Sequence, residues 1–307
     1  MELIQKELNK INNRIDDALF NHYDILKDIL DYPIENRGKQ LRAVLGILAG
    51  KVLDTNAELC SSQIDFLSSI ELIHNATLIH DDVIDNAQIR RGNQSLYKKY
   101  GSKLAILTGD YYLSAALKLV VTIQNEKLKE IFSSSIKELI EGELFQDLSL
   151  FKIPPFELYI DVIRRKTALL FELACYGTSL LSSEANEVVC QNLRQFGLNF
   201  GIGFQIGDDL KNFKNYENKP ILNDFENGIM TLPIILLTQN DENLKQDIEN
   251  KKYDFPKILA LLNESNCFDK AEKIARGYFD KAESCLSNLQ NSCYKDKLAE
   301  LSHSICK

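Results

Sequence analysis

Three aspartates at the end of one apolar stretch are the residues whose spacing most directly suggests chemistry. Asp81 and Asp85 are four residues apart, so on a helix their carboxylates lie on one face, one turn apart, with Asp82 on the flank. Carboxylates this close repel each other unless a cation lies between them, and oxygen ligands of this kind suit Mg²⁺, which bridges to substrate phosphates. Arg90 and Arg91 follow one to two turns later, and their guanidinium groups fit a diphosphate. For D-D-x-x-D alone, a solvated acidic patch is the alternative.

A second acidic cluster of the same design occurs at Asp208 and Asp209, at the end of the segment GIGFQIGDD. Gln205 and Asp208 share a helical face, with Asp209 adjacent. The glycines are spaced G-x-G-x-x-x-G with no preceding strand, which is not a dinucleotide-binding fingerprint, so we expect them to allow close helix packing. An exposed helix end is the alternative for this pair alone, and the pair gains its weight from repeating the first cluster.

Basic side chains that could hold two diphosphates occur at three places: Lys39 with Arg42, Arg164 with Arg165 and Lys166, and Lys219. Lys39 and Arg42 are three apart and are predicted to share a face near the start of a helix, where backbone N–H groups favour anions. The segment Arg164-Arg165-Lys166-Thr167 is predicted to open another apolar helix, and Lys219 lies in the most polar loop. A solvated surface charge is the alternative for any single one of them.

Helices are the elements predicted to position these residues. No proline occurs between Pro33 and Pro154, and apolar residues recur at helical spacing with few strand-like alternations. The sequence shows no internal repeat, low-complexity run or linker, so residues 1–307 are predicted to form one all-α domain. The predicted helix breaks lie near residues 32–38, 50–56, 92–101, 151–156, 182–184 and 215–227.

The bulk composition narrows the classes of function. Hydrophobic residues make up 45% of the 307 residues, enough for a sizeable core, and the net charge of −8 argues against a nucleic-acid-binding surface. The seven cysteines are scattered without a C-x-x-C pair, which indicates reduced thiols and a cytoplasmic protein. The N-terminus lacks the layout of a signal peptide, and no stable membrane anchor is expected.

In combination, these motifs resemble the trans-polyprenyl diphosphate synthase family, from Gly38 to the segment YFDKAESCL at 278–286. The family fold is an all-α isoprenoid synthase bundle around a deep central cavity, usually a dimer. The resemblance implies an enzyme of isoprenoid biosynthesis, a prenyltransferase that joins isopentenyl diphosphate to an allylic diphosphate. The motifs are GKQLR, LIHDDVID, RRG, Gly109-Asp110, GELFQ, RRKT, GFQIGDD and TLP at 231–233.

The resemblance also implies a role for each matching residue. Asp81, Asp82 and Asp85 match the first aspartate-rich motif, and Asp208 and Asp209 begin the second. Together they would hold three Mg²⁺ per active site, with Asp81, Asp85 and Asp208 as direct ligands. The positions that bind isopentenyl diphosphate match Lys39, Arg42, His74 and Arg91. The positions on the allylic side match Arg90, Lys166, Thr167, Gln205 and Lys219.

Three positions depart from the family pattern. Asn212 stands where the second motif normally has a third aspartate, and it can accept a hydrogen bond but carries no charge. Ile229 removes a possible phosphate contact, and Ala43 stands in place of the usual proline after Arg42. These departures leave open a partner-dependent, non-catalytic subunit of a heteromeric synthase as the alternative to a homodimeric enzyme.

Product length is predicted from the residues one turn before Asp81. Ala76 and Thr77 are small, which leaves a tunnel open and predicts a medium or long chain; a short-chain (C15–C20) synthase is the alternative. Phe66 lies about 22 Å deeper on the same stripe at 1.5 Å per residue, and it reads as a core aromatic rather than a tunnel floor. Tyr111 and Tyr112 are candidates to narrow the tunnel.

Two other enzyme classes share parts of this pattern. A terpene cyclase uses a similar aspartate-rich motif but needs no site for isopentenyl diphosphate, so Lys39, Arg42 and Arg91 argue against it. A His-Asp phosphohydrolase would use His80 with Asp81, but that class needs more histidines than the four of this chain.

Overall fold

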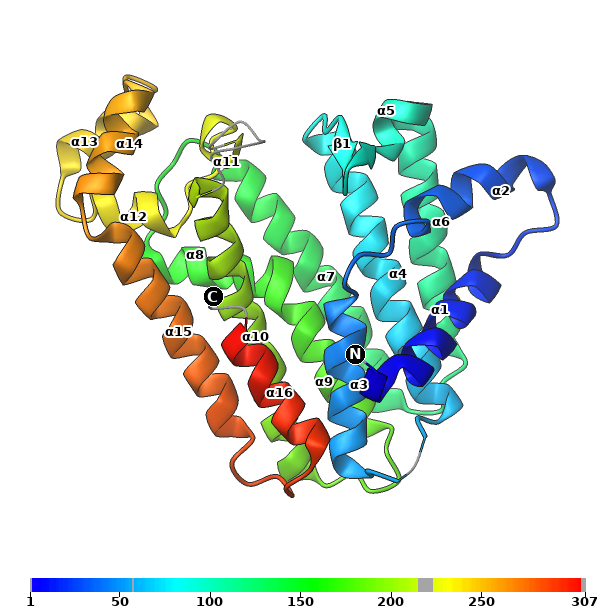
Figure 1. Ribbon diagram of the computed structural model, residues 1–307. Coiled ribbons are helices and arrows are strands. Elements are labelled where there is room, and N and C mark those ends of the chain that lie inside the picture. Colours follow the sequence, from blue (N-terminus) through cyan, green and yellow to red (C-terminus); the bar gives the residue numbers. More distant parts are fainter. Residues whose placement is uncertain (1, 57, 215–222, 305–307) are drawn as a thin grey trace. The chain divides into compact units, whose positions relative to one another are not determined.

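The computed structural model describes residues 2–56, 58–214 and 223–304, and its regular structure is helical apart from one short hairpin (Figure 1). The all-α prediction is therefore confirmed. The chain divides into two compact units. Unit 1 comprises Met1–Phe132, Leu173–Leu193 and Leu289–Lys295; unit 2 comprises Ser133–Glu172, Arg194–Asn288 and Asp296–Lys307. The single domain over residues 1–307 and its central cavity stay predictions.

Unit 1 contains the helices of the N-terminal third and the hairpin. These elements are η1 (Glu2–Ile4), α1 (Gln5–Leu19), α2 (Asp24–Asp31), η2 (Tyr32–Ile34), α3 (Leu41–Leu53), α4 (Ser61–Ile84), β1 (Ile89–Arg90), β2 (Asn93–Gln94), α5 (Leu96–Tyr100) and α6 (Ser102–Val121).

Four helices have residues in both units, and the rest belong to unit 2. The shared helices are α7 (Glu126–Leu148), α9 (Leu169–Leu180), α10 (Glu187–Lys214) and α16 (Cys293–Ser304). Unit 2 adds α8 (Phe156–Ile163), the π-helical turn η3 (Arg164–Ala168), α11 (Asn223–Glu226), α12 (Leu232–Thr238), α13 (Glu242–Glu249), α14 (Phe255–Glu264) and α15 (Cys267–Cys285).

Helix α4 is the central element of unit 1, and Figure 1 shows it alongside α6, with α1 and α3 also packed against it. The helix begins at a capping box, in which the Gln63 side chain accepts a hydrogen bond from the Cys60 N–H at 2.9 Å. It ends where Asn86 takes a left-handed conformation, φ 52°, which asparagine tolerates better than most residues. Asp81 and Asp82 lie in its last turn and Asp85 is its C-cap, so a buried helix presents the first cluster at its end.

A two-residue turn closes the hairpin between β1 and β2. Ile89 pairs with Gln94 and Arg90 with Asn93, which leaves Arg91 and Gly92 as the loop, both with positive φ (51° and 82°). Two positive φ angles define a type I′ turn, the type whose twist matches that of paired strands. The motif RRG therefore encodes a turn as well as two charges.

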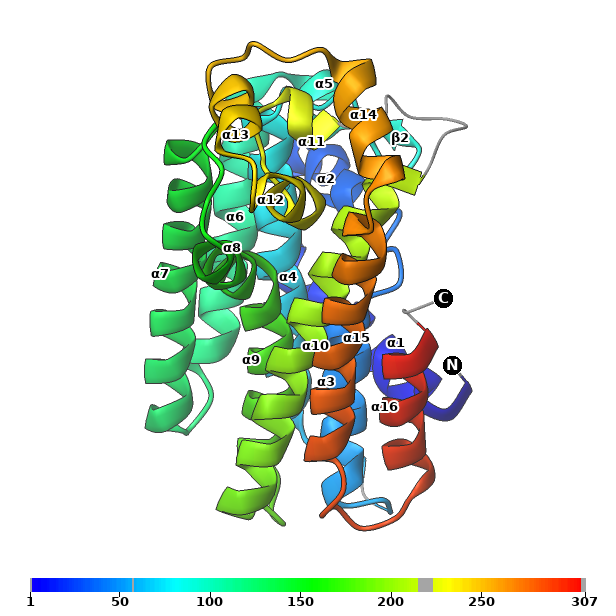
Figure 2. The same cartoon turned by 90° about the vertical axis from the view of Figure 1, so that its left-hand side faces the viewer.

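Unit 2 has its own apolar core, and Figure 2 shows α12 with α13, α14 and α15 around it. The glycines of α10 allow the close packing that the sequence predicts. A Cβ at Gly201 would lie 2.5 Å from the Ala168 Cα, and one at Gly203 would lie 3.1 Å from the Phe279 ring. Gly207 differs, because a Cβ there would meet nothing within 4 Å.

Among the described residues, α6 is the one helix long and apolar enough to cross a membrane by composition, with 44% of that stretch buried in the structure. Five large apolar residues of this helix are exposed. They are Leu104, Ile106, Leu107, Leu117 and Val121.

Candidate active site

The first acidic cluster forms on α4 as the helical spacing predicts. His74, Thr77 and Asp81 lie along the helix and Asp85 caps it. Asp81 is partly exposed and Asp85 exposed. The Thr77 hydroxyl donates to the His74 carbonyl at 2.9 Å within the helix, so the hydroxyl is held against the backbone.

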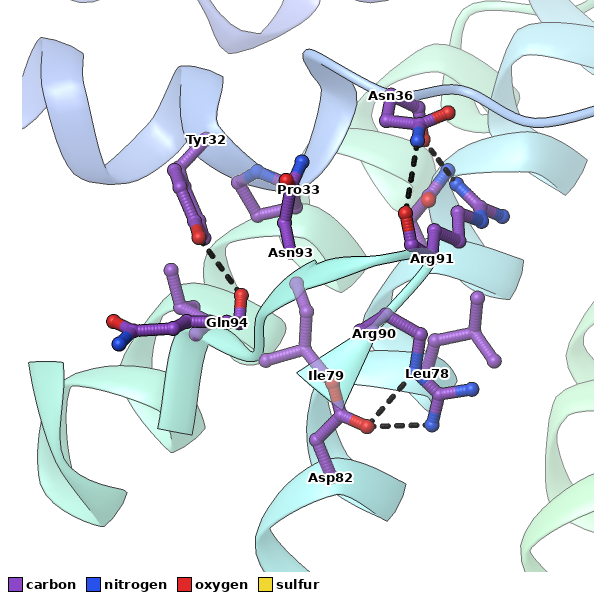
Figure 3. Close-up of a pocket in the computed structure, with 12 residues that line it drawn as sticks. Tyr32, Pro33, Asn36, Leu78, Ile79, Asp82, Arg90, Arg91, Asn93 and Gln94 are labelled. Carbon is purple, nitrogen blue, oxygen red and sulfur yellow. Dashed lines mark hydrogen bonds and ion pairs between the residues drawn. The ribbon is translucent and has the colours of Figure 1, made fainter. Parts of the chain in front are cut away.

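Asp82 is turned inward and is 3% exposed. The Arg90 Nε donates to the Asp82 Oδ1 at 2.9 Å, and Nη2 donates to the same oxygen (Figure 3). Both donors come from the β1 strand, so the pair ties the hairpin to the last turn of α4. Asp82 therefore forms an ion pair with Arg90, whereas Asp81 is partly exposed and Asp85 is exposed.

The Arg91 side chain is anchored by the turn before α3. Its Nη1 donates to the Asn36 carbonyl at 2.6 Å, and the Asn36 amide donates back to the Arg91 carbonyl at 3.2 Å (Figure 3). Gly38 has φ 64°, and a Cβ there would lie 3.2 Å from the Arg91 guanidinium. The glycine of the GKQLR motif thus makes room for Arg91, which the sequence did not indicate.

Lys39 and Arg42 do not share a helix face, contrary to the prediction. Helix α3 begins at Leu41, and Gln40 before it is left-handed (φ 46°), so Lys39 lies exposed on the preceding turn. Only Arg42 lies on the helix, in its first turn. The left-handed residue between them explains the error, because a spacing of three implies a common face only in continuous helix.

Glu71 is a buried acid that the sequence analysis missed. It is 2% exposed, and its Oε1 accepts the Ala43 N–H at 2.9 Å in the first turn of α3. Burial raises the pKa of Glu71, while the positive charges of Arg42, Arg91 and Arg37 oppose that rise. The Ala43 N–H is a donor that proline would lack, so the departure at Ala43 supplies a hydrogen bond to this acid.

Positive charge concentrates around His74. Burial is the largest cause that lowers the pKa of His74 well below its usual value, and the charges of Arg42, Arg91 and Arg90 lower it further. Burial also lowers the pKa of Arg42, to about 10. Unit 1 therefore brings four of the predicted diphosphate-binding residues together, with a neutral imidazole among three guanidinium groups, a suitable environment for an anion.

A small pocket of about 50 Å³ lies behind these arginines, lined by Arg90, Arg91, Asp82, Asn75 and Asn36 among others (Figure 3). Sites for small organic ligands usually measure roughly 300 Å³ or more. The pocket is therefore a water-sized space behind the arginines, too small for a substrate.

The second acidic cluster repeats the alternation of the first. Asp208 is exposed, and Asp209 is 4% exposed. The Asp209 Oδ2 accepts the Tyr159 hydroxyl at 2.7 Å, and its Oδ1 accepts the Gln205 amide at 2.7 Å. The Thr167 hydroxyl donates to the Gln205 Oε1 at 2.6 Å. Burial raises the pKa of Asp209 to about 7, and the charges of Asp224 and Asp208 add to this rise against the two hydrogen bonds.

The RRKT motif does not open a helix, contrary to the prediction. Arg164–Ala168 form a π-helical turn between α8 and α9, and such turns occur often at functional sites. Lys166 donates to Glu143 of the GELFQ motif at 2.8 Å, whereas Arg164 and Arg165 pair with Asp161 and with acids of α7. Lys166 and Thr167 thus lie on the same turn, as the motif predicts.

Asn212 is exposed, and its side chain is hydrogen-bonded. Its amide nitrogen donates to the Asp224 Oδ2 at 2.8 Å, so the residue in place of the third aspartate is bonded to an acid from α11. Asp224 was missed because its segment reads as loop. Lys219 lies outside the described residues.

A divalent cation fits the donor chemistry of these residues, because they are carboxylate oxygens. Among residues 2–56, 58–214 and 223–304, no group of three or more acids, histidines or cysteines is already gathered around a metal position. Asp82 and Asp209 are each held by internal donors. By exposure, the residues best placed to reach a metal are Asp81, which is partly exposed, and Asp85 and Asp208, which are exposed.

The residues considered for product length all lie in unit 1. Ala76 is buried and Thr77 partly exposed. Phe66 is fully buried against Phe132, with ring centroids 6.2 Å apart, and is a core aromatic. The two tyrosines turn toward the N-terminal helices: the Tyr112 hydroxyl donates to the Leu30 carbonyl at 2.5 Å, and the Tyr111 hydroxyl accepts from Asn21 at 3.2 Å.

His80, which a phosphohydrolase would use with Asp81, faces α6. Its Nε2 lies 3.3 Å from the Ile106 carbonyl, and a Cβ at Gly109 would lie 2.3 Å from that nitrogen. The imidazole fills the space that Gly109 leaves, so the Gly-Asp motif serves helix packing here.

Comparison with known proteins agrees with this geometry. The family model for polyprenyl synthetase matches residues 23–268. The decaprenyl-diphosphate synthase of Dictyostelium discoideum is 33% identical over 287 residues, which cover 92% of this chain and 62% of that protein's length. Heptaprenyl diphosphate synthase component 2 of Bacillus subtilis is 27% identical over 313 residues, 99% of this chain and 88% of that protein.

The fold also matches a solved structure. The crystal structure of heptaprenyl diphosphate synthase from Staphylococcus aureus has a TM-score of 0.92 and 28% identity, covering 99% of this chain and 98% of that one. The fold is thus the isoprenoid synthase fold. The match over residues 23–268 shows that this chain belongs to the polyprenyl synthetase family and is a prenyl transferase.

Proposed function

We propose that this protein joins isopentenyl diphosphate to an allylic diphosphate, with Mg²⁺, and makes a polyprenyl diphosphate of medium or long chain. The observation that carries the proposal is the cluster of Arg42, Arg90 and Arg91 around a neutral His74 on the helix that ends in Asp81 and Asp85. The matched relatives include a decaprenyl and a heptaprenyl synthase, which supports the longer product.

The chain's own residues divide the work between two anions. Arg42, His74 and Arg91 hold isopentenyl diphosphate together with Lys39, which reaches it from the exposed turn. Arg90, aimed by Asp82, holds the allylic diphosphate. These charges stabilise the departing diphosphate as its C–O bond breaks, and the double bond of isopentenyl diphosphate attacks the allylic carbon. The released diphosphate takes the proton.

In unit 2 the allylic diphosphate is held by Lys166 with Thr167 and Gln205. Lys166 would exchange Glu143 for the diphosphate when the substrate binds. Lys219 keeps its proposed place on the allylic side from the sequence alone.

The metal requirement belongs to the proposal. Asp81, Asp85 and Asp208 would hold Mg²⁺, three ions per site by family resemblance, and the ions would neutralise diphosphate charge and so favour ionisation. Magnesium is favoured because it binds through a few carboxylates and keeps waters for the substrate phosphates.

The test is incubation of the purified chain with Mg²⁺, farnesyl diphosphate and labelled isopentenyl diphosphate, followed by sizing of the products. A ladder that ends beyond C20 supports the proposal, and a stop at C20 or below would replace the long product with a short one. No extension by a folded chain contradicts independent catalysis.

A partner-dependent subunit is the second candidate function. The similarity to heptaprenyl diphosphate synthase component 2, a protein named as one component of an enzyme, favours it, as do Asn212 and Ile229. It predicts no extension by the chain alone and recovery when a second component is added.

We also propose that the protein is a dimer, by way of the apolar residues exposed on α6. Leu107 and Val121 are 54% and 68% exposed. Apolar side chains exposed together on a protein surface often mark a protein–protein interface. Light scattering of the protein and of a Leu107→Glu, Val121→Glu variant tests this, and a monomeric wild type contradicts it. A cytoplasmic location is proposed because none of the six described cysteines is joined in a disulfide.

Product length tests the small residues on α4. Thr77→Phe adds a bulky ring one turn before Asp81, so we expect the longest product to lose at least one isoprene unit. The Thr77→Val variant, which keeps the volume, serves as the control. Identical product ladders for Phe and Val would show that Thr77 does not line the tunnel.

A further inference from the structure

The second acidic motif contains two neighbouring aspartates in different environments. Asp208 is exposed, whereas both carboxylate oxygens of Asp209 already accept hydrogen bonds within unit 2. A metal ion could reach Asp209 only by displacing the Tyr159 hydroxyl or the Gln205 amide from a site that is 4% exposed. A buried acid that loses such donors pays a large desolvation cost.

The hydrogen bonds around Asp209 form one chain across three elements. The chain runs from Tyr159 on α8 to Asp209 on α10, then to Gln205 one turn earlier, and then to Thr167 on the π-helical turn. The donor and acceptor roles are fixed along its length. The Gln205 amide nitrogen donates to Asp209 and the Gln205 Oε1 accepts from the Thr167 hydroxyl, so the amide group cannot flip without losing both bonds.

Close packing of the backbone places this chain of hydrogen bonds where it can orient Asp208 and Lys166. Gly201 seats α10 against Ala168 of the π-helical turn, with room for no side chain between them. Asp208 lies between Gln205 and Asp209 in sequence, and Lys166 is next to Thr167. The chain therefore fixes the turn of α10 that carries Asp208 relative to the turn that carries Lys166.

We propose that Asp209 and Tyr159 are positioning residues, which hold Asp208 and Lys166 in register for a metal-bound diphosphate, and that Asp209 is not itself a metal ligand. The inference rests on the proposed function for the identity of the anion. Groups that orient a metal ligand from behind usually change metal affinity by about 10- to 100-fold when they are removed.

The test measures binding rather than turnover. Mn²⁺ is titrated into the protein in the presence of inorganic diphosphate, and Mn²⁺ binding is followed by electron paramagnetic resonance. We expect Tyr159→Phe and Asp209→Asn each to weaken Mn²⁺ binding by about tenfold, and Asp208→Asn to weaken it much more. The double variant Tyr159→Phe, Asp209→Asn should be no weaker than Asp209→Asn alone, because both changes break the same chain.

The matched control is Tyr253→Phe, a tyrosine of unit 2 that packs on Phe225 and is not one of the four residues of this hydrogen-bond chain. It should bind Mn²⁺ like the wild type. Thermal unfolding of every variant separates lost folding from lost positioning: a lower melting temperature with unchanged Mn²⁺ affinity for Tyr159→Phe would make the chain purely structural and overturn the proposal.

Two other results would also overturn it. Equal losses for Asp208→Asn and Asp209→Asn would make Asp209 a ligand. If the wild type did not bind Mn²⁺ with diphosphate, there would be no metal site at Asp208 for Asp209 and Tyr159 to position. A wild type that binds Mn²⁺-diphosphate with the expected order of variants, but transfers no prenyl group, would overturn the proposed function and leave the positioning intact.

Discussion

The two acidic clusters share a design but differ in what holds the inner aspartate. In each, an outward aspartate is followed by one that is almost fully buried: Asp81 and Asp82 on α4, Asp208 and Asp209 on α10. Asp82 is held by a guanidinium from the hairpin, whereas Asp209 is held by neutral donors, Tyr159 and Gln205.

The difference has an electrostatic consequence. Arg90 neutralises the charge of Asp82 where it is buried. Asp209 accepts from two neutral donors, Tyr159 and Gln205, and burial raises its pKa to about 7. Neighbouring aspartates in a D-D motif are therefore not equivalent ligands, because one faces the site and the other fastens the helix end to the rest of its unit.

The outward aspartates should carry the largest functional effect. Asp81→Asn and Asp208→Asn each remove a charge that faces the proposed metal, and we expect turnover to fall about a hundredfold or more, since metal charge stabilisation is worth several kcal/mol. Stability should change little because Asp208 is exposed and Asp81 is partly exposed. Steady-state kinetics and thermal unfolding measure the two effects, and a variant with near-normal turnover would remove that aspartate from the metal site.

The inner pair of the first cluster should show an asymmetry in stability. Arg90→Ala leaves the Asp82 carboxylate buried without its cation, which costs about 3 kcal/mol. Asp82→Ala leaves a guanidinium that is 38% exposed and can turn to water, so we expect about 1–2 kcal/mol. Urea unfolding of both variants measures this, with Lys103→Ala on the surface of α6 as the control. Equal losses of unfolding free energy would mean that the buried Asp82 carboxylate depends less on Arg90 than the geometry indicates.

The positions of the helices could be predicted from the sequence, because apolar residues at helical spacing indicate a helix whatever packs against it. The stripe from His74 to Asp85, the packing role of Gly201 and the break after Leu53 were all found as expected. Residue type and spacing also identified Arg91 and Lys166 as candidates.

The errors occurred where local backbone departs from regular helix. A left-handed Gln40 separates Lys39 from Arg42, and the RRKT segment is a π-helical turn within a helical run rather than a start. Spacing rules assume 3.6 residues per turn and fail at both places. Burial was also invisible, so Glu71 and the inward turn of Asp82 could not be inferred from a pattern of acids.

His74 tests the buried, positively charged surroundings of the first cluster. Its pKa is lowered in the folded state, so below about pH 6.5 the unfolded chain binds a proton that the folded chain does not. The neutral imidazole therefore contributes stability above that pH, and this contribution is lost as the pH falls. Between pH 7.5 and 5.5 we expect His74→Gln to lose about 1 kcal/mol less unfolding free energy than the wild type. His22→Gln, on the surface of unit 1, is the control, and parallel curves for wild type and His74→Gln would mean that folding does not lower the pKa of His74.

The smallest effect concerns the third position of the second cluster. Asn212 looks like a lost acid, but its amide donates to Asp224 at 2.8 Å. Asn212→Asp would restore the family residue and place two carboxylates in contact, so we expect a loss of about 0.5–1 kcal/mol in urea unfolding, limited because the pair is exposed. The double variant Asn212→Asp, Asp224→Asn exchanges donor and acceptor and should recover that stability. If Asn212→Asp alone were as stable as the wild type, Asp224 would not be the reason for the asparagine. Recovery of stability in the double variant would show that the second cluster avoids a further carboxylate beside Asp224. In the first cluster, Arg90 compensates the charge of the buried Asp82.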